Sequence, residues 1–282
     1  MLAALLLNAQ ALAAYPNDVV LSSMVEWNGT TVTEPEIVSA AYQQLVLELG
    51  AAIANKPTAP ANTLGVNGFD VGVSSSFSFV GAAGDTTEPS PWMRAHETGD
   101  PSPVVWVPGL ELRKGLPLSL EVGTRAGYVG ASNQMVAGAW GRAGLIEGYR
   151  QAPDLSLQVG YSGYLGNDEL ELGVLDWSFT LGYQLPFGRL KGINDAVFAP
   201  YAGLGQLRIH ASPLLDEDVA DTLGITPLTG FDPTGDGYMD QLRPLQLHGG
   251  VRIQKGAFRF LTAVTASPKI VPTVTTGLGF TF

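Results

Sequence analysis

The sequence predicts an all-β fold: a single antiparallel transmembrane β-barrel of about ten strands, with eight to twelve possible, and a short N-terminal helical segment. Three observations support this prediction. From residue 67 to the C-terminus, apolar residues alternate with small or polar ones, the period-two pattern of strands with one apolar face. Many of these segments are roughly 10 to 14 residues long, longer than strands of soluble sheets usually are. Counted along the chain, the two longest connections are both odd-numbered, as in barrels with short turns at one end and long loops at the other.

The composition narrows the class of protein. The 282 residues include 35 Gly and no Cys, 45% of them are hydrophobic and only 15% are charged. Beyond the N-terminus there is no run of the roughly 20 apolar residues that a membrane helix needs. A net charge of −11 argues against binding to nucleic acid, which favours a basic surface. The absence of Cys excludes disulfides, thiol catalysis and thiolate metal sites.

Residues 64–282 are expected to form the barrel. A parity change within residues 170–183 predicts a bulge near Val174, and the facing of residues 134–147 is undecided because Trp140 and Arg142 share a face. A soluble barrel or sandwich is the alternative, but the non-apolar faces are built of Gly, Ser and Thr, which suit a narrow lumen better than a water-facing exterior. The ten alternating segments are residues 67–79, 104–113, 116–128, 134–147, 155–161, 170–183, 197–210, 245–253, 257–266 and 272–282.

The last strand ends on aromatic residues. Apolar side chains, Leu278, Phe280 and Phe282 among them, alternate there with Thr and Gly. This ending resembles the C-terminal assembly signal of bacterial outer-membrane β-barrel proteins, although no subfamily is matched. The resemblance implies a location in the outer membrane of a Gram-negative cell with periplasmic termini. It also implies contact with outer-membrane lipid, lipopolysaccharide and the barrel-assembly machinery.

The N-terminal residues have the pattern of a secretory signal peptide. An apolar run at residues 2–7 precedes an A-x-A site at residues 11–13, so cleavage after Ala13 is expected and residues 1–13 would be the signal peptide. The basic residues that usually precede such a run are missing, which a start codon assigned too late would explain. An N-terminal core helix is the alternative, but Pro16 and Asn17 interrupt the segment before an amphipathic pattern develops.

Residues 14–63 are expected to form a periplasmic segment with one helix at about 35–54. Apolar residues recur there at every fourth position, from Ile37 to Ile53, and Pro35 suits a first helical turn. The helix could plug the barrel or close its periplasmic mouth. A lumen bounded by about ten strands leaves little room for a helix about 10 Å wide, so we expect the second arrangement.

Charged side chains on the polar faces are expected to point into the lumen, where they could line a narrow pore or pair off and close it. A two-residue turn at Lys255-Gly256 would place Arg252 opposite Arg259. Like charges in that position predict a carboxylate between them, with Glu121 preferred, unless both reach water at the periplasmic mouth. On the same reasoning Leu118, Leu120 and Val122 face lipid while Ser119, Glu121 and Gly123 face the lumen. The expected lumen residues are Glu111, Glu121, Arg125, Asp176, His248, Arg252 and Arg259.

Two groups of residues could in principle bind a metal ion or catalyse a reaction. Residues 232–240 resemble a calcium loop, but Arg243 stands where the bidentate Glu should be, which favours an acidic surface turn. His210 and His248, with acidic residues at 216–218, suggest comparison with outer-membrane proteases of the omptin type, whose motifs are not matched. We therefore expect neither catalytic residues, nor a metal site, nor a cofactor.

The function predicted from these patterns is that of an outer-membrane barrel acting as a narrow pore or transport channel for small solutes, or as a structural membrane protein. A surface binding or adhesion protein that uses its long extracellular loops is the alternative. A hydrolase with a site at the rim ranks last.

Overall fold

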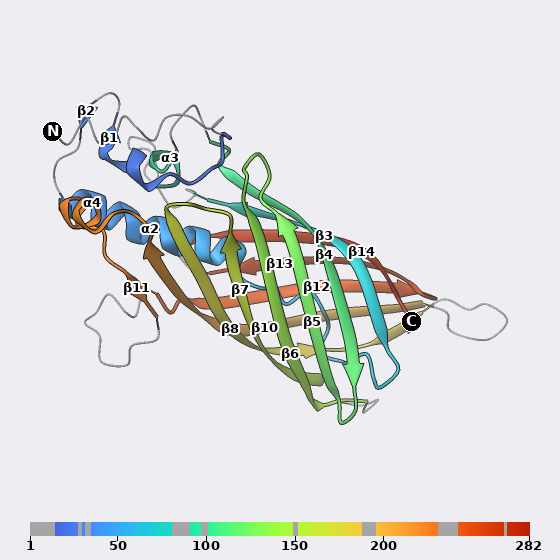
Figure 1. Ribbon diagram of the computed structural model, residues 1–282. Helices are drawn as coiled ribbons and strands as arrows, with labels where there is room; N and C mark the ends of the chain where they lie inside the picture. The colour runs from blue at the N-terminus through green and yellow to red at the C-terminus, as the bar shows by residue number, and fades with distance from the viewer. Residues whose placement is uncertain are drawn as a thin grey trace.

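A computed structural model describes residues 15–27, 30–31, 35–80, 91–96, 101–148, 152–187, 196–230, 242–267 and 270–282 of the chain. Ten long strands close into one antiparallel barrel (Figure 1), as predicted. Two short strands, β9 (Leu185–Phe187) and β11 (Leu228–Thr229), pair with the long strand β10. The barrel strands are β3 (Phe69–Phe79), β4 (Val104–Leu116), β5 (Leu120–Tyr128), β6 (Met135–Ile146), β7 (Asp154–Leu165), β8 (Leu170–Gly182), β10 (Ala196–Pro213), β12 (Leu245–Lys255), β13 (Phe258–Ala266) and β14 (Pro272–Thr281).

The barrel closes where the first strand, β3, pairs with the last, β14, and Val73 lies opposite Leu278. At the end of this seam, the backbone N–H of Phe69 donates to the carbonyl of Phe282 (2.9 Å), and the N–H of Phe282 donates to the carbonyl of Phe69 (2.7 Å). Closure leaves no unpaired edge between the ten strands, which is what a β-structure needs in order to cross hydrocarbon.

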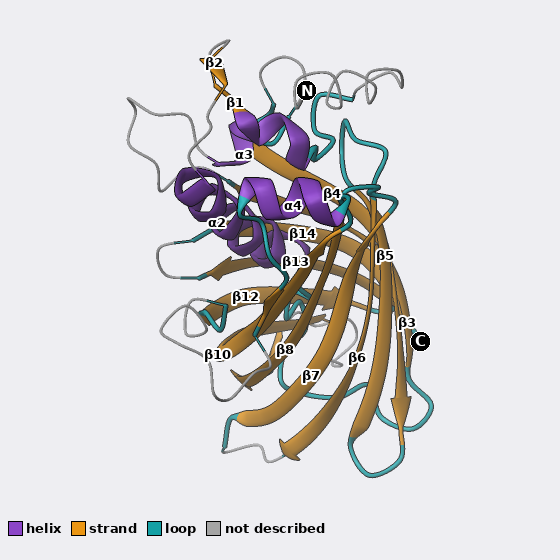
Figure 2. Cartoon of the chain, turned by 60° about the vertical axis from the view of Figure 1, so that its left-hand side comes forward, coloured by secondary structure: helices purple, strands orange, loops and turns teal. Residues whose placement is uncertain are grey.

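The two ends of the barrel differ. The end that carries Phe69, Phe282 and the tight connections β4–β5 and β12–β13 is called the turn end. The opposite end, called the cap end, carries the longest connections, with the short helices α3 (Pro91–Arg94) and α4 (Glu217–Leu223) (Figure 2). The N-terminal residues also lie at the cap end, where the N–H of Asn17 donates to the carbonyl of Ala131 in the β5–β6 connection (3.0 Å). They form η1 (Leu21–Val25) and the strand pair β1 (Glu26–Trp27) and β2 (Thr30–Thr31).

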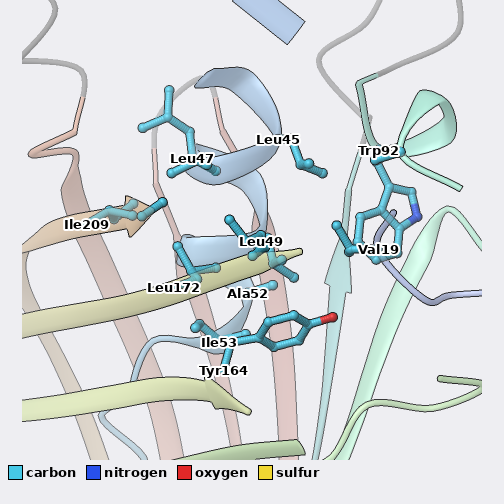
Figure 3. Close-up of a cluster of buried hydrophobic side chains, with 14 of the residues drawn as sticks. Val19, Leu45, Leu47, Leu49, Ala52, Ile53, Trp92, Tyr164, Leu172 and Ile209 are labelled. Carbon is cyan, nitrogen blue, oxygen red and sulfur yellow. The ribbon is translucent and has the colours of Figure 1, made fainter. Parts of the chain in front are cut away.

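The helix α2 (Pro35–Ile53) runs from the cap end into the barrel. Its apolar side chains pack on inward-facing side chains of β7, β8 and β10, with Leu49 and Ile53 close to Leu172 and Tyr164 (Figure 3). The fit is close: a Cβ on Gly50 would lie 2.8 Å from the side chain of Ile209. The expectation that this helix only closes a mouth of the barrel is therefore wrong. The lumen has room because α2 is held against one side of its wall and the facing wall residues at the cap end are mostly Val, Leu, Ile and Ala.

Residues 54–64, called the plug segment, continue from α2 through the rest of the lumen to the turn end, where β3 begins. Residues 54–61 are all buried. The described residues up to Ile53 thus lie at the cap end or inside the barrel, on the side opposite to the start of β3. The sequence predicts a periplasmic segment at residues 14–63, on the same side as the C-terminus. The described residues differ from this prediction because the chain crosses the lumen before it enters the first strand.

The bulge predicted near Val174 is absent, because β8 pairs without a register shift on both sides. Leu172 and Val174 point inward together with Asp176. The apolar residues of β8 change from one face to the other because the inner wall is apolar at the cap end, where it meets α2, and polar further along. The register shift lies instead in β6, between Gly144 and Ile146.

The outside of the barrel is apolar. Side chains such as Leu110, which is 60% exposed, stand at alternate positions and face outward. An exposed apolar band of this extent suits lipid and is avoided on water-facing surfaces. Other members of the band are Val73, Leu112, Val122, Val159, Leu181, Leu204, Leu247, Val264 and Leu278. No helix within the described ranges is long and apolar enough to cross a membrane.

The β4–β5 hairpin corrects the predicted orientation of two residues. Leu120 and Val122 face outward while Glu121 and Gly123 face inward, as predicted. Leu118 and Ser119, however, lie in the turn with φ of 63° and 54°. They face neither lipid nor lumen, because β5 begins only at Leu120.

Candidate functional site in the barrel lumen

The lumen has two unlike halves. In the cap half the inward-facing side chains are apolar and enclose α2; Val107, Val136, Leu172 and Leu207 are examples. In the turn half they are charged and hydroxyl-bearing and enclose the plug segment. This division explains why a single strand such as β4 carries Val105 and Val107 on its inner face and then continues with charged residues.

All seven lumen residues proposed from the sequence lie on the side of the sheet opposite to the apolar exterior. Six of them are buried: Glu111, Glu121, Asp176, His248, Arg252 and Arg259. Arg125 is partly buried, and its Nη2 donates to the carbonyl of Ile53, the last residue of α2 (3.4 Å). This contact places a cation at the C-terminus of the helix, where the helix dipole favours it.

Asp70 is the centre of the charged half, although the sequence patterns did not single it out. Its carboxylate accepts hydrogen bonds from Nε and Nη2 of Arg259 (2.6 Å each) and from the hydroxyl of Thr281 (2.6 Å). Arg113 forms an ion pair with the same carboxylate (2.9 Å). One fully buried carboxylate thus joins β3, β4, β13 and β14 across the seam where the barrel closes. Its position near the start of a strand made it look like an ordinary polar-face residue.

The predicted pairing of Arg252, Arg259 and Glu121 is wrong. The turn residues of the β12–β13 hairpin are Gly256 and Ala257, with Lys255 opposite Phe258. This register puts Arg259 opposite Gln254 and Arg252 opposite Leu261, so the two arginines are not directly opposed. The partner of Arg259 is Asp70, which comes from β3 at the seam and so could not be inferred from the hairpin.

Glu121 has a different role, since it holds the plug segment to the wall. It is bonded to Arg142, lies 3.6 Å from Nη1 of Arg113, and accepts the backbone N–H of Leu64 (3.1 Å). Arg142 in turn donates to the carbonyl of Pro60 (2.8 Å). Glu121 and Arg142 together satisfy polar backbone groups that the plug segment carries into the lumen, as burial requires.

Further hydrogen bonds anchor both ends of the plug segment. Near its start, the side-chain amide of Asn55 donates to Asp176 (2.9 Å). Thr58 donates to Glu111 (3.2 Å). Towards the turn end, the N–H and the hydroxyl of Thr63 donate to Glu147 (2.6 and 2.9 Å). The plug segment is therefore bonded to the wall along its whole length.

The two histidines do not share a site. His248 is buried inside the barrel, where its ring nitrogen lies 3.0 Å from the hydroxyl of Thr180. His210 stacks on Tyr161, an exposed residue of the exterior. The described residues contain no group of three or more His, Cys, Asp or Glu side chains placed to hold a metal ion. The calcium-like loop at 232–240 and the expected signal peptide at 1–13 lie outside the described residues.

The residues of the expected assembly signal lie on the outside of β14. Phe280 packs against Phe258 and Phe282, with ring centroids 6.0 and 6.5 Å apart. Together with Leu278, these residues form an exposed apolar and aromatic surface at the turn end, as in the interfacial girdles of membrane barrels.

Comparisons with known proteins give only distant fold matches. No protein-family model matches the sequence, and no curated protein sequence matches it. Similar solved structures include the N-terminal β-barrel domain of OprF from Pseudomonas aeruginosa, with 10% identity, a TM-score of 0.30, and 77% of this chain and 99% of that chain covered. Omp33 from Acinetobacter baumannii has 10% identity, a TM-score of 0.29, and coverage of 76% and 99%. Ail, the attachment invasion locus protein of Yersinia pestis, has 12% identity, a TM-score of 0.23, and coverage of 76% and 97%.

These superpositions are too poor to transfer a function. The class of the molecule follows from its own geometry: ten strands closed without an edge, an apolar exterior and a polar interior. The chain is a transmembrane β-barrel whose lumen is occupied by its own N-terminal region.

Proposed function

We propose that the protein is a closed outer-membrane barrel that anchors a folded cap at the cell surface and serves as a structural or surface-binding protein. The main support for this proposal is that the plug segment occupies the turn half of the lumen and is hydrogen-bonded to its wall. If the assembly signal acts as it does in outer-membrane barrels, the turn end faces the periplasm. The cap, made of residues 15–27 and 30–31 with α3 and α4, then faces outward.

The strength of the plug contacts argues against an open diffusion pore. A hydrogen bond to a charged group contributes about 1.5–3 kcal/mol, and Asp176, Glu121, Arg142 and Glu147 each make at least one to the plug segment. Breaking only two of these bonds would cost about 3 kcal/mol or more, which leaves an open state below about one per cent. The wall residues around the segment are themselves buried, so a water-filled path beside it is not favoured.

Conductance in planar bilayers tests this proposal, with a variant that locks the plug. A Cβ on Gly182 would lie 3.5 Å from the Cβ of Ala61, within the roughly 3.5–4.5 Å range of disulfides. The same Cβ would be 3.0 Å from the backbone nitrogen of Ala61, so the segment would shift slightly. Since the chain has no Cys, the double variant Ala61→Cys/Gly182→Cys adds the only thiols.

The wild-type barrel should show no steady single-channel conductance, and oxidation of the double variant should change nothing. Each single Cys variant serves as the control for oxidation. A steady conductance in wild type that disappears when the double variant is oxidised would replace this proposal with the second candidate, a narrow pore gated by the plug. That candidate is favoured by one observation, the group of arginine side chains in the turn half (Arg113, Arg142, Arg252 and Arg259).

A further inference from the structure

One buried cation in the turn half has no partner among the residues that the structure describes. Arg252, on β12, is only 4% exposed. It makes no hydrogen bond and no ion pair with any residue in the described ranges, and its Nε is buried without an acceptor. Its cross-strand neighbours are Ala199 on β10 and Leu261 on β13, neither of which has a side-chain acceptor. An unpaired charge at such a depth is costly unless something compensates it.

The neighbouring charges make this cost larger. Arg252 lies within electrostatic range of Arg113, Arg142 and Arg259. The carboxylate of Asp70 also acts on Arg252, but it is already paired with Arg113 and Arg259. Positive charge therefore predominates around Arg252. Arginine does not lose its proton in proteins, so titration does not remove this charge.

The region around Arg252 contains further hydrogen-bond donors that have no acceptor in the described part of the chain. Nε of Arg142 and Nη1 of Arg259 are buried without an acceptor. The hydroxyl of Tyr201 is also buried without a partner, and it lies within electrostatic range of Arg252 and Arg142. Tyr201 is on β10, diagonal to Arg252, because it pairs with Gly250. The unpartnered groups of Arg252, Arg142, Arg259 and Tyr201 can all donate, and an acceptor that carries negative charge would satisfy them.

We propose that the turn half of the lumen binds one small monovalent anion, of the size of chloride, at the guanidinium of Arg252. One such ion supplies a counter-charge for Arg252 and an acceptor for several donors, whereas a water molecule supplies no charge. Its small size follows from the near-complete burial of Arg252 and its neighbours, which leaves little space. The site is distinct from the cap and does not depend on whether the barrel binds a partner at the surface.

Thermal unfolding in detergent tests the site, with sodium chloride compared to sodium gluconate at constant ionic strength. The gluconate anion is too large for the space described. Wild type should show a saturable rise of a few degrees in Tm with chloride. In Arg252→Gln this rise should vanish, and in gluconate the variant should be at least as stable as wild type, because an uncompensated charge has been removed. The control Lys255→Gln removes one positive charge from the same strand at an exposed position, and it should keep the chloride effect.

Crystals of the wild-type protein grown with sodium bromide locate the ion independently of any variant. An anomalous bromide peak within hydrogen-bond distance of the Arg252 guanidinium supports the proposal, even if Arg252→Gln does not fold. Absence of that peak, with only water there, overturns it. So does a chloride effect that is missing in wild type or equal in wild type and Arg252→Gln.

Discussion

Replacement of Asp70 by Asn should strongly destabilise the barrel, because it removes the carboxylate that joins the first and last strands. Arg113 would keep Glu111 and Glu121, each at 3.6 Å. Arg259, which is 1% exposed, forms its ion pair with Asp70, and no other carboxylate in the described ranges reaches it. The loss is therefore that of one partner of a buried ion pair, about 3–5 kcal/mol. Asn retains the volume and can still accept from Thr281, so we expect the lower end of that range.

The assay is reversible urea unfolding in detergent micelles, followed by tryptophan fluorescence and by heat-modifiable migration on gels. Asp221→Asn makes the same chemical change at an exposed position in α4, and it should alter the free energy of unfolding by less than about 0.5 kcal/mol. Because the Asp70 cluster is buried, its contribution should vary little with ionic strength. A loss below about 1 kcal/mol for Asp70→Asn, or a loss that salt largely removes, would refute the reasoning.

Three further predictions concern the exterior, assembly and the cap. Leu110→Arg, on the lipid-facing side of β4, should cost about 2–4 kcal/mol of unfolding free energy in lipid, whereas Leu118→Arg, in a turn and 90% exposed, should cost little; equal losses would contradict the assigned exterior. Removal of Phe282 should lower the amount of folded, heat-modifiable protein in outer-membrane fractions, and undiminished assembly would argue against the assembly signal. Burial lowers the pKa of His96, in the cap, to about 4 from the usual 6.5. The unfolded chain therefore binds the proton first, and stability should fall by up to about 3 kcal/mol as the pH drops from about 6.5 to 4; His96→Gln should flatten this fall, and a profile equal to that of wild type would exclude the effect.

The barrel could be predicted because its signals are local. Side chains on a strand alternate between two faces, so residues such as Leu120 and Glu121 report their own orientation without reference to the rest of the chain. Strand number and the positions of long connections follow from the same pattern. The predicted orientation was wrong where a strand began later than expected, as at Leu118, and where the inner wall was itself apolar, as at Val174.

The interior could not be predicted in the same way, because its contacts join residues far apart in sequence. The partner of Arg259 is Asp70, 189 residues away, and that of Asn55 is Asp176, 121 residues away. Neither separation along the sequence corresponds to a recognisable sequence pattern. The width of the lumen also predicted the wrong place for α2. The width of a barrel of ten strands does not specify how closely the helix backbone, as at Gly50, can approach a wall side chain such as Ile209.

The chain crosses the lumen between residues 15 and 66, and labelling of single cysteines tests this path directly. Tyr15 is exposed at the cap end and Val66 at the turn end, and each has a reference residue on the same side: Leu214 at the cap end and Leu118 in a turn at the other. A membrane-impermeant maleimide applied to intact cells should label Tyr15→Cys together with Leu214→Cys, whereas Val66→Cys and Leu118→Cys should react only after the outer membrane is permeabilised. Labelling of Tyr15→Cys and Val66→Cys from the same side would contradict the threaded barrel.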